Sequence, residues 1–216
     1  MKIFLLGATG DTGYEVLKKL ISENHKVKIL VRTPSKLNTA DIPNLQKDQI
    51  EVIQGSVMEA EKLIDLFKDC DAIVSALGTG KNNSYTEIYS KGGRNIIAAM
   101  RSNQIKRLIT ITSALIDMSD TSTDNFFLNR IIRPNFNKIY SDQTRWETIL
   151  DDTTDINWTC VRPTYLVNKE FTGRYRIKNQ HCPPKGRKIG RSDLADFIVK
   201  VLYSNEYIHQ KPVLAY

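Results

Sequence analysis

Residues 2–13 read KIFLLGATGDTG, an apolar run followed by three regularly spaced glycines. The apolar run from Ile3 to Leu6 has the length and composition of a buried β-strand. Glycines follow it at positions 7, 10 and 13, and an amphipathic segment comes next. This spacing between a strand and a helix permits a tight turn and lets a pyrophosphate approach the helix N-terminus. The stretch therefore predicts a dinucleotide-binding loop, with a glycine turn that binds no ligand as the alternative.

Outward from this loop, short apolar runs alternate with longer helical segments. The predicted strands are Ile3–Leu6, Val27–Val31, Ile50–Ile53, Ala72–Ala76, Arg107–Thr112 and Asn157–Val161. The predicted helices lie near Thr12–Glu23, Glu59–Lys68, Thr86–Ser102 and Tyr140–Leu150. Such alternation implies right-handed crossovers and a parallel sheet covered on both faces. We therefore predict an α/β protein with a doubly wound parallel sheet, the three-layer α/β/α Rossmann fold.

The domain organisation predicted from 216 residues is a single domain spanning 1–216, because no linker or repeat divides the chain. Two irregular insertions, about 115–138 and 165–190, each follow a predicted strand. Open parallel sheets bind ligands at the carboxyl ends of their strands. We expect these insertions to form a small substrate-side region that walls a pocket.

The composition, 41% hydrophobic and 25% charged, excludes fibrous and disordered classes. The apolar runs are far shorter than the roughly 20 residues of a membrane-spanning helix. The strand that begins at Lys2 leaves no room for a signal peptide. The three cysteines are widely spaced, which disfavours a disulfide framework or a zinc cluster. We expect a cytoplasmic protein without membrane contact.

The net charge of +7 is concentrated late in the chain. Between positions 163 and 191, eight lysines and arginines face one acid, Glu170. A solvated loop surface explains this region, and attraction of an anionic ligand or weak nucleic-acid affinity are the alternatives. No recognised nucleic-acid-binding module is present, so a nucleic-acid partner is disfavoured.

The end of the second predicted strand distinguishes between cofactors. Residues 30–36 read LVRTPSK, and no acid occurs there before Asp41. An NAD site usually places a carboxylate here, whereas NADP needs cations around its 2′-phosphate. The planar guanidinium of Arg32 can bind a phosphate through two N–H groups. Ser35 can donate a hydrogen bond from its hydroxyl, and Lys36 adds a flexible ammonium group. We predict NADPH as the cofactor, with plain surface residues of the loop as the alternative.

Further motifs continue along the chain. They are Gly55, Ala76–Thr79, Gly93–Met100, Thr112–Ala114, Pro163–Tyr165, Thr172–Gly173 and Ser192–Leu194. Together with residues 7–13 and 30–32, they resemble the atypical short-chain dehydrogenase/reductases, an NAD(P)-binding Rossmann family that includes the NmrA-like proteins. Within that family, the chain looks most similar to the biliverdin-IXβ and NADPH-dependent flavin reductases. The resemblance runs from Lys2 to about Leu202.

The resemblance implies a role for each matched residue. The implied pyrophosphate loop is Gly7, Thr9, Gly10, Asp11 and Thr12, and the implied 2′-phosphate site is Arg32, Ser35 and Lys36. Ser56 and Val57 would adjoin the adenine, although the family usually has aspartate where this chain has Ser56. Ala76, Leu77 and Gly78 would pass under the ribose and the nicotinamide. Ser113 would stand beside the nicotinamide, and Pro163, Thr164 and Tyr165 would close its pocket.

The proton-donating apparatus of carbonyl-reducing relatives is incomplete here. Those enzymes use Tyr-x-x-x-Lys, but Tyr140 is followed four residues later by Thr144. Tyr140 is therefore either a general acid with poor driving force or a packing residue at a helix start. Tyr165 stands where the similar reductases have a histidine near the substrate. Ser113, Tyr140 and Tyr165 are our candidate catalytic residues.

Reductases of this group stack a flat acceptor against NADPH, and the proton comes from solvent. The resemblance thus implies an NADPH-dependent oxidoreductase that transfers hydride to a planar acceptor such as flavin or a biliverdin-like compound. The alternative is a catalytically weak, NADP(H)-binding, redox-sensing regulator of the NmrA type, which would bind a protein partner. The two hypotheses differ in whether NADPH is oxidised when an acceptor is present, since a regulator should bind NADPH without oxidising it.

The remaining candidate residues point to no further chemistry. His25, His181 and His209 lack neighbours at metal-ligand spacing, so we expect no metal. Phe126, Phe127 and Trp146 either line a flat aromatic pocket or belong to the core.

Overall fold

The computed structural model describes residues 1–80, 83–120 and 128–216. Eight strands form one sheet in the order β3-β2-β1-β4-β5-β6-β10-β8. These strands are β1 (Lys2–Leu6), β2 (Lys26–Val31), β3 (Ile50–Gln54), β4 (Ala72–Ser75), β5 (Arg107–Ile111), β6 (Asn157–Pro163), β8 (Arg176–Asn179) and β10 (Pro212–Ala215). The edge strand β8 runs antiparallel to β10, and the other neighbours in this sheet pair in parallel. The order reverses between β1 and β4, so the doubly wound Rossmann prediction is confirmed.

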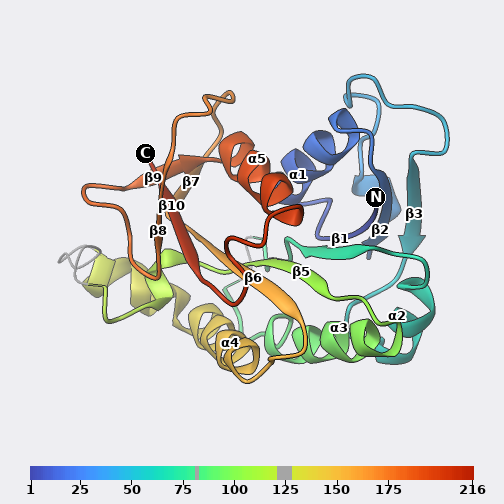
Figure 1. Cartoon of the computed structure of the whole chain (residues 1–216). Coiled ribbons are helices and arrows are strands. Elements are labelled where there is room, and N and C mark those ends of the chain that lie inside the picture. Colours follow the sequence, from blue (N-terminus) through green and yellow to red (C-terminus); the bar gives the residue numbers. More distant parts are fainter. Residues whose placement is uncertain (81–82, 121–127) are drawn as a thin grey trace.

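Helices cover both faces of the sheet (Figure 1). On one face lie α1 (Asp11–Ser22) and α5 (Arg191–Leu202), which pack against each other. On the other face lie α2 (Ala60–Leu66), α3 (Ser90–Ser102) and α4 (Arg133–Asp151). Short helical turns at Pro34–Lys36, Ala114–Ile116 and Leu128–Ile132 complete the helical elements of the described residues. The result is three layers, α/β/α.

The first strand shows why the chain forms this layered core. Successive side chains of a strand point to opposite faces of its sheet. Ile3 and Leu5 belong to the buried cluster on the α1/α5 side. Phe4 and Leu6 belong to the cluster on the α2/α3/α4 side. A continuous apolar run therefore suits β1, since both of its faces are covered.

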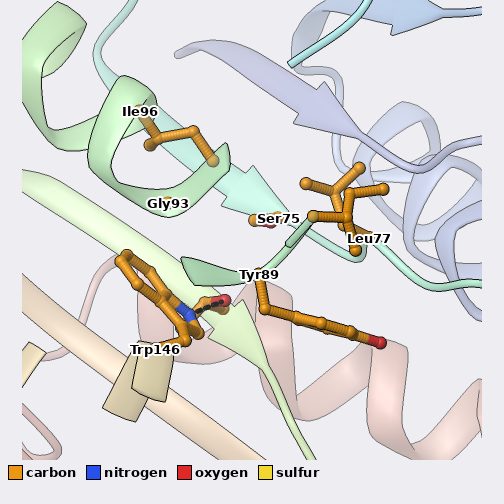
Figure 2. A pocket seen from close by; sticks show the side chains of 8 residues that line it. Ser75, Leu77, Tyr89, Gly93, Ile96 and Trp146 are labelled. Atoms are coloured by element: carbon orange, nitrogen blue, oxygen red, sulfur yellow. Dashed lines mark hydrogen bonds between the residues drawn. The ribbon is translucent and has the colours of Figure 1, made fainter. Parts of the chain in front are cut away.

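Close packing between α3 and α4 depends on Gly93. A Cβ atom at this position would lie 2.3 Å from the ring of Trp146. Figure 2 shows Trp146 directly beside the turn of α3 that carries Gly93, with its ring nitrogen bonded to Thr110. The space among these side chains admits no water molecule. Trp146 is thus a core residue, only 2% exposed, and lines no ligand pocket.

The insertions are more regular than predicted. Helix α4 begins at Arg133, inside the predicted 115–138 insertion, because Pro134 lies in its first turn, where proline is tolerated. Within 165–190, β7 (Tyr165–Val167) and β9 (Lys188–Gly190) form a two-stranded parallel sheet, while β8 joins the main sheet. Phe126 and Phe127 lie outside the described residues.

Candidate functional site

Apart from Tyr140 on α4, the predicted site residues lie at or shortly after the carboxyl ends of six neighbouring strands. Parallel register places these ends at one edge of the sheet, as the pairs Leu6 with Leu30 and Leu6 with Ser75 show. The loops after β1, β2, β3, β4, β5 and β6 therefore open on the same edge, around the point where the strand order reverses. Ligands of doubly wound sheets bind at this point.

The glycine loop after β1 is built for a close approach of backbone to ligand. Gly7 has a φ of +87°, and a Cβ there would lie 2.3 Å from the carbonyl oxygen of Ala76. A Cβ at Gly13 would lie 2.1 Å from the carbonyl oxygen of Gly7. At Gly10, by contrast, the nearest atom would be 3.5 Å away. The fold thus requires Gly7 and Gly13, whereas Gly10 leaves space at the N-terminus of α1, where a pyrophosphate fits.

The acidic residue of this loop has a cationic neighbour. Asp11, in the first turn of α1, is largely exposed and lies 3.6 Å from the guanidinium of Arg191 on α5. Arg191 also donates to the side chain of Asn168. These contacts connect the glycine loop with the segment after β7. Thr9 is exposed and Thr12 is half-buried, so both lie near the surface of the loop.

An open pocket of about 440 Å³ lies beyond the ends of β2 and β3. It is lined by Arg32, Gln54, Gly55, Ser56, Glu59 and Lys62. Of the predicted adenosine-site residues, the structure thus brings together Arg32 and Ser56. Ser35 and Lys36 lie on the Pro34–Lys36 turn, exposed and outside this lining. Val57 is buried, and its carbonyl oxygen accepts a hydrogen bond from Asn95.

Two hydroxyl groups meet at the end of β5. Ser113 follows this strand, which ends at Ile111, and its hydroxyl accepts from the Leu115 N–H at 3.2 Å. The same side chain lies beside the Tyr140 hydroxyl on α4. Burial raises the pKa of Tyr140, against the opposing effects of the neighbouring Ser113 hydroxyl and the Arg133 charge. Tyr140 is therefore a neutral phenol at neutral pH, able to donate a proton.

Tyr140 lies in the middle of α4, so the predicted start of this helix at Tyr140 is wrong, while its packing and proton-donating roles both stay predictions. Thr144 follows one turn later. Its hydroxyl donates to the Tyr140 carbonyl oxygen at 2.9 Å, and its side chain is exposed. No ammonium group therefore stands where the carbonyl-reducing relatives have their lysine.

A second tyrosine, absent from the sequence prediction, lies close to the loop after β4. Tyr89 precedes α3, and Asp142 of α4 accepts a hydrogen bond from its N–H at 2.9 Å. The Tyr89 hydroxyl lies near the Gln143 side chain and would be 3.9 Å from a Cβ at Gly78. Figure 2 shows its ring extending past Leu77, away from Trp146. Because Tyr89 and Gln143 are far apart in sequence, no local pattern indicates this contact.

A buried ion pair holds the face of α4 that carries Tyr140. Glu147 lies two turns beyond Tyr140 and forms a salt bridge with Arg162 of β6. The Glu147 carboxylate also accepts from the Thr112 hydroxyl at 2.7 Å. Arg162 additionally donates to Asp117, at 2.8 Å. This network fixes α4 against the ends of β5 and β6, beside Ser113.

The loop after β6 contributes less than predicted to an enclosed pocket. The Thr164 hydroxyl donates to the Leu214 carbonyl oxygen at 2.9 Å, so it faces β10. Pro163 is buried in β6. Tyr165 is 75% exposed on β7. Of these three residues, Tyr165 offers a free aromatic surface at this edge.

The motifs at 172–173 and 192–194 are structural. Asp193, fully buried in the first turn of α5, accepts hydrogen bonds from both the N–H and the hydroxyl of Thr172, at 3.0 and 2.8 Å. It also accepts from the Gly173 N–H at 2.8 Å and the Tyr216 hydroxyl at 2.5 Å. Burial opposes ionisation, but these four donors keep the pKa of Asp193 below its ordinary value.

The described residues contain no metal-binding cluster and no membrane-spanning helix. Within the described ranges, no three histidines, cysteines or acids are grouped as metal ligands. Across those same residues, no helix has the length and apolarity to cross a bilayer. The three cysteines are buried and unlinked.

The fold and the glycine loop together define a dinucleotide-binding Rossmann protein. A family model described as NAD(P)H-binding matches residues 7–205, and the chain belongs to this NAD(P)H-binding family. The predicted NAD(P)-binding Rossmann family is thereby confirmed. The narrower resemblance to biliverdin-IXβ and flavin reductases stays a prediction.

Individual relatives agree with this assignment. An uncharacterized Bacillus subtilis protein, YwnB, is 26% identical over 98% of this chain and 95% of its own length. The oxidoreductase aflX of Aspergillus parasiticus is 25% identical, and the match covers 76% of this chain and 65% of aflX. A short-chain dehydrogenase/reductase from Veillonella parvula, solved in complex with NADP, has a TM-score of 0.80 at 14% identity, covering 100% of this chain and 94% of that one. At that identity, the structural likeness concerns the fold.

Proposed function

We propose that the protein is an NADPH-dependent oxidoreductase that transfers hydride to a planar acceptor, such as a flavin or a biliverdin-like compound. The observation that carries the proposal is the pairing of Tyr140 with Ser113 while Thr144 occupies the lysine position. Without a neighbouring ammonium group, the phenol is a weak proton donor. This arrangement favours acceptors that take their proton from solvent. Relatives named as oxidoreductases support the reaction class.

The residues present fit a nicotinamide dinucleotide. The space at Gly10 and the unpaired N–H groups of the first turn of α1 suit a pyrophosphate. Arg32 in the open pocket suits the 2′-phosphate. NADPH, when bound, supplies the hydride. The protein orients the two reactants and holds hydroxyl groups beside them.

Beyond the ends of β5 and β6, each predicted catalytic side chain has a proposed task. Ser113, in the loop just after β5, can donate a hydrogen bond to the carboxamide or the acceptor. Tyr140, held neutral by burial, can donate a hydrogen bond to an acceptor heteroatom. The exposed ring of Tyr165 offers a surface on which a flat molecule can stack.

A screen of NADPH oxidation tests the proposal. FMN, riboflavin, biliverdin isomers, quinones and small aldehydes would be compared, with Gly10→Val as a matched control for reduction without bound cofactor. We expect turnover with planar acceptors and none with aldehydes. Turnover with aldehydes alone would indicate a tyrosine-dependent carbonyl reductase instead. Tight NADPH binding without turnover would favour the NmrA-type regulator.

A further inference from the structure

The open pocket beyond β2 and β3 contains two cations and one carboxylate. Arg32 comes from the loop after β2, and Glu59 and Lys62 come from the start of α2. The formal charge of this lining is therefore +1. A 2′-phosphate carries close to two negative charges at neutral pH, so this balance bears directly on which cofactor enters.

Glu59 is fixed in place by two contacts. Its carboxylate accepts from the Ser56 N–H at 2.8 Å. It also forms an ion pair with the Lys62 ammonium group, one helical turn further along. The Lys62 and Ser56 contacts together keep the pKa of Glu59 below its ordinary value. A full negative charge thus stands in the pocket at neutral pH.

Arg32 is the cation that remains available. Its side chain is exposed and makes no ion pair with any residue in 1–80, 83–120 or 128–216. Lys62 is already paired, but its side chain is 67% exposed and can reorient at little cost. The pocket can therefore present two donors to one phosphate.

We propose that Lys62 determines cofactor specificity, because it neutralises Glu59 and joins Arg32 in binding the 2′-phosphate of NADPH. This inference rests on the proposed use of NADPH. It assigns the second cation to α2, whereas the sequence pattern favoured Lys36 on the loop after β2. Lys36 lies outside the pocket lining.

The electrostatic reason is specific to the phosphate. Without Lys62, the lining would have a formal charge of zero, and the unmasked Glu59 carboxylate would repel the 2′-phosphate. NADH has a 2′-hydroxyl there, and a carboxylate is a good acceptor for that group. Loss of Lys62 should therefore weaken NADPH binding and spare NADH binding. The effect should diminish as the salt concentration rises.

Calorimetric titration of NADPH and NADH tests the proposal on the wild type, Lys62→Met, Glu59→Gln and the double variant. Lys68→Met is the matched control, because Lys68 forms an equivalent ion pair with Asp65 outside the pocket. We expect Lys62→Met to weaken NADPH binding about fivefold, with NADH unchanged. Adding Glu59→Gln should restore most of that loss, since glutamine keeps an acceptor for Ser56 without the charge. Lys68→Met should change neither affinity.

Each other outcome has a definite meaning. An unchanged NADPH to NADH ratio in Lys62→Met would overturn the role of Lys62, as would equal weakening of both cofactors. No recovery on adding Glu59→Gln would overturn the role given to Glu59. Equal affinity of the wild type for both cofactors would instead refute the proposed NADPH dependence. NADH binding also reports whether each variant is folded.

Discussion

The side chains of Ser113 and Tyr140 lie next to each other, which brings the loop after β5 against the middle of α4. The contact exists although Thr144 stands where a lysine would complete the usual proton donor. The protein thus has two neighbouring hydroxyl groups here without the lysine of the Tyr-x-x-x-Lys pattern. In the proposed reaction, Ser113 and Tyr140 mainly orient the reactants, and the proton comes from solvent.

Substitution of Ser113 and of Tyr140 tests whether these residues orient the reactants or deliver the proton. Tyr140→Phe should lower flavin-reductase turnover by less than about tenfold, because removal of a committed general acid costs roughly 10² to 10⁴. Ser113→Ala should cost more, since Ser113 also accepts from the Leu115 N–H and shapes the loop after β5. Steady-state rates at saturating NADPH decide the order. A hundredfold loss in Tyr140→Phe with little effect of Ser113→Ala would contradict it.

The glycine loop yields a paired prediction. Gly10→Val should abolish cofactor binding while the fold persists, because a Cβ there meets its nearest atom at 3.5 Å and a branched side chain fills the pyrophosphate space. Gly13→Val should destabilise the protein itself, because its Cβ would lie 2.1 Å from the Gly7 oxygen. Circular dichroism and cofactor titration on the same samples separate the two effects. Cofactor binding by Gly10→Val would mean that the loop is only a turn.

The buried ion pair behind Tyr140 should be important for stability. Glu147→Gln would leave the Arg162 guanidinium incompletely paired in a buried site, at a cost of about 3–5 kcal/mol. The matched control is Asp155→Asn, which removes an exposed pair with Arg101 and should cost less than about 1 kcal/mol. Urea denaturation measures both. An equally small loss of stability in both variants would indicate that Asp117 alone is a sufficient ionic partner for Arg162.

Asp193 predicts a pH dependence. Because its folded-state pKa lies below the ordinary value of 3.8, ionised Asp193 stabilises the fold fully above pH 3.8. This contribution is lost as the pH falls through the lowered folded-state pKa. Asp193→Asn should therefore be less stable than the wild type at neutral pH, and the gap should narrow below about pH 4. A gap that stays constant with pH would contradict an ionised Asp193.

The fold was largely predictable because its signals are local. The glycine loop and the apolar runs of β1 to β6 lie within short windows of sequence. Helix α5 was missed because it is buried on most of its surface, so its apolar residues show no clear stripe. The short strands β7, β8 and β9 lie among charged residues and take their pairing from distant partners.

The candidate site was predictable in part, for a related reason. Gly10, Arg32 and Ser113 each follow a recognisable strand. Lys62 enters the site only because α2 starts beside the end of β3, and nothing in its local sequence distinguishes it from other surface lysines. The contact between Tyr89 and Gln143 likewise depends on the packing of α3 against α4.

We propose that the pocket at the ends of β2 and β3 selects NADPH. Calorimetric titration of NADPH and NADH into the wild type and Arg32→Ala measures this selectivity. We predict that the wild type binds NADPH at least about tenfold more tightly, since a charge-assisted phosphate contact contributes roughly 1.5–3 kcal/mol. Arg32→Ala should lose most of that preference with NADH affinity unchanged. Equal affinity of the wild type for both cofactors, or a preference that survives in Arg32→Ala, would contradict the claim.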